Sequence, residues 1–186
     1  SSDLKFINGT LSTTKRFETR VRKEKATQRQ EENIFYLKNC ENLYPGLKYE
    51  LHGVSPTWSI IPLSRPQNVS QDVPLDVSVR DSLNECGKRL FSGKFKVYRQ
   101  EDIPKDWHYS GNRRLLDLFL ISDDGTEIYY GLEPNWRPKG ISVWGNHGYN
   151  NTLESMRPLF IANGRNFKSS YEHPTIFQNV DLYPLM

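Results

Sequence analysis

The sequence predicts a fold that mixes α-helices and β-strands, and two features of the chain indicate this class. Short apolar or alternating runs recur along the chain, as in strands, and one longer segment repeats apolar residues at helical spacing. Between residues 45 and 131 these signals follow in the order strand, strand, helix, strand, strand, strand. That order describes a compact α+β unit.

The first strands are marked by apolar runs and by the turns between them. Ile34–Leu37 is an apolar run consistent with a strand, and Pro45-Gly46 follows as a turn signal. Leu47–Leu51 and Thr57–Leu63 are the next two predicted strands, separated by a turn that contains Gly and Pro. Closely spaced prolines then indicate a loop over about residues 64–75.

The clearest predicted helix covers residues 76–91. Four apolar side chains recur at spacings of four, three and four, which places them on one face. These residues are Val79, Leu83, Cys86 and Leu90. Asp76 is predicted to cap the first turn, because its carboxylate accepts hydrogen bonds from exposed amides. Gly87 is expected to weaken the helix and to end it early.

After the helix the sequence predicts three more strands and then an irregular segment. Phe95–Arg99 alternates like a strand, and Leu115–Ile121 is an almost continuous apolar run. An Asp-Gly turn at residues 124–125 leads to Glu127–Tyr130, which predicts a β-hairpin between these two runs. Residues 131–150 are rich in Gly, Pro, Asn and Trp, so we expect a loop that either carries function or is a surface excursion.

The composition indicates a globular protein of one ordinary domain. The chain has 186 residues, 36% hydrophobic and 25% charged, and no apolar run reaches the roughly 18 residues that a bilayer span requires. The formal net charge is only +3, although basic residues gather between Lys15 and Arg29. Such a run binds nucleic acid in some proteins but is more often a solvated face or a flexible arm. Nucleic-acid binding therefore ranks last among the functions considered.

Glycosylation triplets favour a secretory route. Three Asn-x-Ser/Thr triplets begin at Asn8, Asn68 and Asn150. The two cysteines, Cys40 and Cys86, are too few for a disulfide scaffold or a cysteine-rich zinc site. In an oxidising compartment they are able to pair with each other or with cysteines outside this chain. Secretion would require a signal peptide that was removed or lies upstream.

The most specific motifs lie in the second half of the chain and follow a fixed order. Ile-Pro-Lys-Asp-Trp-His-Tyr at 103–109 precedes Asn-Arg-Arg at 112–114. Gly-Asn-His-Gly-Tyr-Asn-Asn at 145–151 leads into Ser-Met-Arg-Pro-Leu-Phe-Ile-Ala-Asn-Gly at 155–164, and Phe-Gln-Asn-Val-Asp-Leu-Tyr follows at 177–183. This series closely resembles the C-terminal signature of the ectonucleotide pyrophosphatase/phosphodiesterase family.

The resemblance covers about residues 34–186 and implies a particular fold. It implies an α/β fold with an inserted α+β subdomain. This chain would form part of such an alkaline-phosphatase-like domain. Residues 34–44 and 132–186 would be the C-terminal part of the phosphodiesterase domain, and residues 45–131 the inserted α+β subdomain. Residues 1–33 are expected to be a basic extension or a divergent edge.

The resemblance also implies an activity and a metal. Members of the family hydrolyse phosphodiester or pyrophosphate bonds in nucleotides, and some act on lipid or choline phosphodiesters, with two zinc ions and a threonine nucleophile. His147 matches the last histidine ligand of one zinc, and Gly145 and Gly148 beside it allow the tight backbone path that aims the ring. The remaining histidines are not expected to bind metal: His52, His108 and His173.

The family's nucleophile and its other zinc ligands are not recognisable in this chain, so no residue here is assigned a catalytic role. Lys15–Gln30, where one ligand motif is expected, contains no histidine and only Glu18 and Glu24 as acids. A zinc site needs three or four ligands. Three explanations remain: a fragment or processed half that joins another part, a divergent non-catalytic relative, or a chain whose first residues are unrelated to the family.

The preferred interpretation is the C-terminal portion of a secreted zinc-dependent nucleotide pyrophosphatase/phosphodiesterase, outside the cell or on the extracellular face of a membrane. Its partners would be the N-terminal part of the same domain and a nucleotide or phosphodiester substrate. The alternative is a catalytically inactive secreted binding protein derived from this family.

Overall fold

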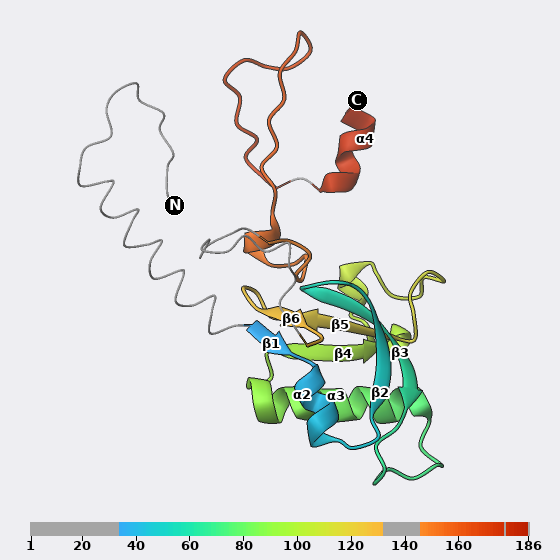
Figure 1. Ribbon diagram of the computed structural model, residues 1–186. Helices are drawn as coiled ribbons and strands as arrows, with labels where there is room; N and C mark the ends of the chain where they lie inside the picture. Colours follow the sequence, from blue (N-terminus) through green and yellow to red (C-terminus); the bar gives the residue numbers. More distant parts are fainter. Residues whose placement is uncertain (1–33, 132–145, 177, 186) are drawn as a thin grey trace, which may run out of the picture.

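A computed structural model describes residues 34–131, 146–176 and 178–185. The predicted basic extension, residues 1–33, and the start of the predicted 132–186 segment lie outside the described residues. Within the described ranges, a two-stranded parallel sheet joins β1 to β6, and an antiparallel sheet has the order β2-β3-β5-β4 (Figure 1). The strands are β1 (Ile34–Tyr36), β2 (Lys48–Val54), β3 (Thr57–Ser64), β4 (Phe95–Arg99), β5 (Leu118–Ser122) and β6 (Glu127–Tyr129).

One long helix, α3 (Leu75–Phe91), packs along one face of the four-stranded sheet, and α2 (Lys38–Leu43) lies beside it (Figure 1). Of the four side chains predicted on one face of α3, Val79, Leu83 and Cys86 are fully buried, whereas Leu90 is exposed. The remaining elements are short: η1 (Gln100–Asp102), η2 (Lys105–Trp107), η3 (Glu154–Met156), η4 (Asn179–Asp181) and α4 (Leu182–Leu185).

Two local predictions about α3 are wrong. The helix continues through Gly87 to Phe91. Gly87 serves packing, because the Phe95 ring leaves little room for a side chain: a Cβ at Gly87 would lie 3.1 Å from that ring. The cap predicted at Asp76 is absent, because the N-cap residue is Pro74 and Asp76 already lies inside the first turn.

Within the four-stranded sheet, strand β5 is buried on both faces. Leu118 and Leu120 belong to the main hydrophobic core beneath α3. Phe119 and Ile121, which alternate with them, belong to a second cluster that the segment after β4 covers on the opposite face. A strand buried on both sides favours a near-continuous apolar run, which explains the four apolar residues from Leu118 to Ile121.

The predicted hairpin between β5 and β6 is wrong. The Asp-Gly turn does form, with the Thr126 amide donating to the Asp123 carbonyl at 3.0 Å. However, β3 and β4 already occupy both edges of β5. The next strand therefore pairs in parallel with β1, where Ile128 lies opposite Phe35.

Residues 34–44 are tied to the rest of the fold by covalent and hydrogen-bonded contacts. A disulfide between Cys40 and Cys86 joins α2 to α3. The Tyr49 hydroxyl donates to the Leu37 carbonyl at 3.0 Å, and the Leu37 amide donates to the Tyr129 carbonyl at 2.8 Å. This segment and residues 45–131 thus share one hydrophobic core.

The end of the chain extends away from this body. We call residues 157–184, apart from the undescribed Phe177, the C-terminal arm (orange and red in Figure 1). Nearly all of its side chains are exposed. Its backbone makes local hydrogen bonds, such as the one that the Phe167 amide donates to the Gly164 carbonyl at 3.1 Å. In the part of the chain that the structure describes, no helix is long and apolar enough to cross a bilayer.

Candidate functional site

The candidate site is built on the His147 loop, residues 146–152. The His147 side chain is exposed, and its backbone amide donates to the Asn146 side-chain oxygen at 2.8 Å. Gly148 has a φ of 98°, which a glycine adopts without strain, and a Cβ there would lie 3.6 Å from Pro56. The glycine therefore lets the loop turn close to the β2–β3 connection.

Tyr149 anchors the loop to the fold. Its side chain is only 7% exposed, and its hydroxyl donates to the Thr126 carbonyl at 3.1 Å. Burial, followed by the nearby charges of Glu127 and Asp124, raises the pKa of Tyr149 to about 12. Two residues away from this anchor, the His147 ring remains at the surface.

Two residues after Tyr149, Asn151 and Ser155, also hold the loop. The Asn151 side-chain nitrogen donates to the Trp107 carbonyl at 3.3 Å, and the Ser155 hydroxyl donates to the Asp124 carboxylate at 2.7 Å. The contacts of Tyr149, Asn151 and Ser155 thus hold the backbone from which the exposed imidazole of His147 projects.

The structure does not bring the other histidines to His147. His52 lies on β2 beside Glu50 at 3.5 Å, His108 is an exposed residue at the turn after η2, and His173 contacts Thr175 in the C-terminal arm. Among the described residues, no three or more His, Cys, Asp or Glu side chains gather as a metal site would require. An exposed imidazole suits zinc chemically, but it supplies one of the three or four ligands that a site takes.

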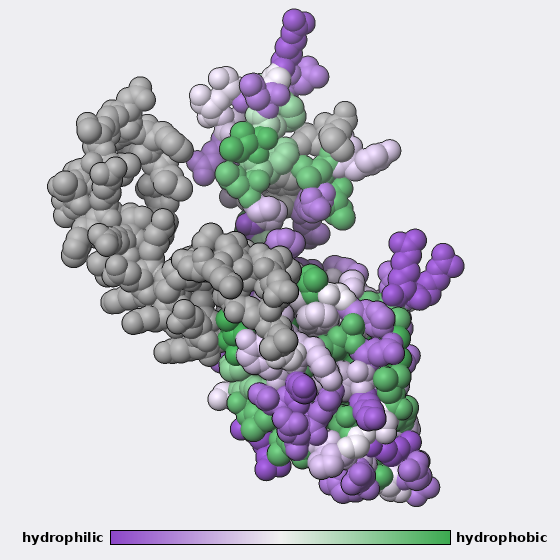
Figure 2. All heavy atoms as spheres, viewed as in Figure 1, coloured by the Kyte–Doolittle hydropathy of each residue, from purple (hydrophilic) through white to green (hydrophobic). Residues whose placement is uncertain are grey.

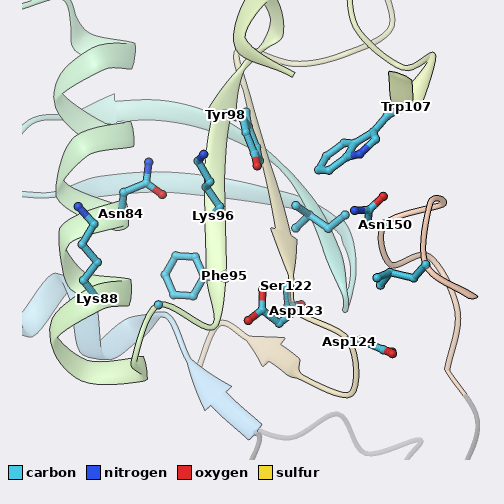
Figure 3. Close-up of a pocket in the computed structure, with 13 residues that line it drawn as sticks. Asn84, Lys88, Phe95, Lys96, Tyr98, Trp107, Ser122, Asp123, Asp124 and Asn150 are labelled. Atoms are coloured by element: carbon cyan, nitrogen blue, oxygen red, sulfur yellow. The ribbon is translucent and has the colours of Figure 1, made fainter. Parts of the chain in front are cut away.

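Two hollows lie next to the loop. The larger, of about 700 Å³, is bounded by α3, β4, the turn after β5 and Asn150, with Trp107 opposite the strands (Figure 3). The smaller, of about 240 Å³, is lined by Tyr149, Tyr109 and Phe119. Trp107 and Asn150 line both hollows.

Sequence reasoning missed the part that Trp107 plays here. Its ring packs edge-on against the Tyr98 ring, with the two ring centroids 5.6 Å apart. Trp107 lies in η2 and Tyr98 in β4, and no periodic sequence pattern links these two elements. Tyr149 both lines the smaller hollow and is buried against the fold.

The predicted glycosylation sites differ in their surroundings. Asn68 is exposed in the loop between β3 and α3, and Asn150 is half-buried at the edge of both hollows. Asn8 lies outside the described residues.

Comparison with known proteins identifies the class to which this fold and loop belong. The type I phosphodiesterase / nucleotide pyrophosphatase model matches residues 30–150, which include the four-stranded sheet and His147. The chain belongs to the ectonucleotide pyrophosphatase/phosphodiesterase family and covers part of its domain. This confirms the family resemblance drawn from the motifs.

Individual relatives agree with this assignment. The bis(5'-adenosyl)-triphosphatase enpp4 of Xenopus laevis is 37% identical over 155 residues, which are 83% of this chain and 28% of that protein. Its human counterpart is 30% identical over 162 residues, 86% of this chain and 30% of that protein. The solved human ectonucleotide pyrophosphatase / phosphodiesterase 5 is 27% identical, with a TM-score of 0.59 over 83% of this chain and 35% of that one. The chain thus spans about a third of the length of these relatives.

Proposed function

We propose that this chain is the C-terminal portion of a secreted zinc-dependent nucleotide pyrophosphatase/phosphodiesterase and that His147 is one of its zinc ligands. The observation that carries the proposal is an exposed imidazole on a loop that buried Tyr149 and the Asn151 and Ser155 hydrogen bonds hold in place. Bound zinc would act as a Lewis acid on a phosphoryl oxygen. The role of His147 would be to hold the metal, with the nucleophile and other ligands supplied by an N-terminal part.

The C-terminal arm supports the requirement for an N-terminal part. Figure 2 shows apolar side chains gathered on the surface of the arm, above the compact body. Leu159, Ile161, Val180 and Tyr183 are each between 74% and 86% exposed. Exposed apolar surface of this kind marks an interaction site. We propose that the N-terminal part of the phosphodiesterase domain covers it.

The domain division inferred from the family remains part of this proposal. Residues 34–44 and 132–186 would belong to the alkaline-phosphatase-like domain, and residues 45–131 to an inserted α+β subdomain. The disulfide and the shared core would then fix the insert to the short segment that precedes it.

The proposed substrate is a nucleotide with a phosphoanhydride or phosphodiester bond. Two of the relatives carry the name bis(5'-adenosyl)-triphosphatase, so diadenosine triphosphate is the first substrate to test. The Cys40–Cys86 disulfide supports an oxidising compartment, and thus secretion or the extracellular face of a membrane.

A fusion protein tests the zinc role of His147. Residues 34–186 would replace the matched part of the Xenopus laevis relative, and the secreted fusion would be assayed for zinc and for hydrolysis of diadenosine triphosphate. We expect about two zinc ions per molecule, and a loss of turnover of at least about 100-fold in His147→Ala. His173→Ala is the matched control, because His173 is also exposed but lies in the C-terminal arm.

Two results would contradict the proposal in different ways. Unchanged zinc content and turnover in His147→Ala would remove the metal role of this residue. A folded fusion that binds nucleotides without zinc and without turnover would instead support the catalytically inactive binding protein.

A further inference from the structure

The larger hollow beside the His147 loop has the size and the walls of a ligand pocket. Its volume of about 700 Å³ lies within the roughly 300–1,000 Å³ of typical ligand sites. Trp107 and Tyr98 provide aromatic surface, Lys96 lies 4.7 Å from the Tyr98 ring centre, and Asp123 and Lys88 add charged groups at the rim (Figure 3). This combination of apolar rings with hydrogen-bonding groups suits a sugar, which has C–H faces and hydroxyl edges.

Asn150, which begins a glycosylation triplet, is held with its amide nitrogen toward this hollow. The Asn150 side-chain oxygen accepts hydrogen bonds from the Thr152 amide at 3.0 Å and from the Thr152 hydroxyl at 2.9 Å. Because both donors require an oxygen, these contacts fix which way the side-chain amide faces. In Figure 3 the nitrogen of Asn150 points toward the strands that bound the hollow, and the oxygen points away from them. That nitrogen is the atom to which an N-linked glycan is attached.

We propose that Asn150 carries an N-linked glycan whose first sugars lie in the larger hollow against Trp107. The nitrogen of Asn150 bonds to the anomeric carbon of a lipid-linked oligosaccharide diphosphate, the donor of the secretory pathway. One N–H bond breaks and its proton is released, while the lipid diphosphate departs with the electron pair of the broken C–O bond. The proposal requires secretion but no zinc and no phosphodiesterase activity.

Asn68 provides a comparison within the same chain. Asn68 is exposed on the loop between β3 and α3 and lines neither of the two hollows. A glycan on Asn68 would extend into solvent, whereas one on Asn150 would be partly covered by protein. The two sites therefore differ in how easily an enzyme reaches the glycan.

Deglycosylation of the folded protein tests the proposal. The full chain would be secreted from a eukaryotic host, digested with an endoglycosidase without denaturant, and followed at each site by glycopeptide mass spectrometry. We expect Asn150 to be occupied and its glycan to be released about tenfold more slowly than that of Asn68, because release requires local opening. Trp107→Ala should abolish the difference.

A second measurement does not depend on the folding of the Trp107 variant. Hydroxyl-radical oxidation of Trp107 should increase in Asn150→Gln and stay unchanged in Asn68→Gln, with Trp58 as the internal reference. An unoccupied Asn150, equal release at both sites, or equal oxidation of Trp107 in the two variants would each overturn the proposal. None of these readouts involves zinc or hydrolysis, so they are separate from the test of His147.

Discussion

At the scale of single residues, Tyr149 holds the His147 loop on the fold. Tyr149→Phe keeps the buried ring and removes the hydrogen bond to the Thr126 carbonyl. We expect the free energy of unfolding, measured with urea, to fall by about 1 kcal/mol. Tyr171→Phe is the matched control, because Tyr171 is exposed in the C-terminal arm and its change should be neutral. An equal loss in both variants would show that the Thr126 contact does not matter.

The raised pKa of Tyr149 predicts a loss of stability at alkaline pH. Burial moves the pKa from 10.0 to about 12, so between these values the unfolded chain binds fewer protons than the folded one. The contribution is fully present below pH 10, and the free energy of unfolding falls as pH rises toward 12. Tyr49, whose pKa is also raised by burial, adds to the fall. Urea unfolding across this range should show a smaller fall in Tyr149→Phe, and an identical fall would contradict the assignment.

The sequence motif located the His147 loop but not the contacts that hold it. The glycine beside His147 predicted a tight path, and Gly148 indeed has a positive φ. The anchors of the loop are Thr126 and Trp107, which lie 23 and 44 positions away from their partners. Such long-range contacts leave no local pattern, so only the fold reveals them.

At the scale of elements, α3 closes the open edge of the four-stranded sheet through Asn84. The Asn84 side-chain nitrogen donates to the Val97 carbonyl at 2.9 Å, and its oxygen accepts from the Val97 amide at 2.8 Å. Because β4 is an edge strand, these bonds take the place of a missing neighbouring strand.

Removal of this bridge should destabilise the fold. Asn84→Ala leaves both backbone groups of Val97 without their protein partner, so we expect the free energy of unfolding to fall by about 2 kcal/mol. Arg89→Ala on the exposed side of α3 is the control and should change it little. Thermal and urea unfolding of the two variants would measure the difference, and equal stability would exclude a role for the bridge.

The disulfide should contribute more than any single hydrogen bond. Cys40 and Cys86 are 46 positions apart, and closing a loop of this length stabilises a fold by about 2 to 4 kcal/mol. We expect the double variant Cys40→Ala/Cys86→Ala to lose this amount in urea unfolding. A reducing agent should destabilise the parent chain and leave the double variant unaffected; sensitivity of both would point to another cause.

Elements with a local signature were predictable, and their pairing was not. The periodicity of α3, the apolar runs of β3 and β5 and the alternation of β4 gave the correct element types. The β5–β6 hairpin failed because an Asp-Gly turn specifies a bend but does not show whether the edges of β5 are free. Gly87 was misjudged because helix propensity does not register the Phe95 ring that lies against it.

At the scale of the whole molecule, the C-terminal arm should add little to the stability of the isolated chain. Its side chains are nearly all exposed, so a chain that ends at Met156 should unfold within about 0.5 kcal/mol of the full one. Urea unfolding of the two chains makes the comparison. A large loss on truncation would mean that the arm packs on the body, and it would remove the surface proposed for the N-terminal part.

The parallel pairing of β1 with β6 imposes an order on biosynthesis. Ile34 lies opposite Glu127, so 127 minus 34, or 93, positions separate the paired residues. The ribosome must therefore release the chain beyond Tyr129 before β1 is able to pair with β6, whereas Cys40 and Cys86 emerge earlier and are able to be oxidised first. Pairings that span so much of a chain form slowly. Until then the edge of β1 that later faces β6 is unpaired, and unpaired strand edges of this kind are what chaperones shield.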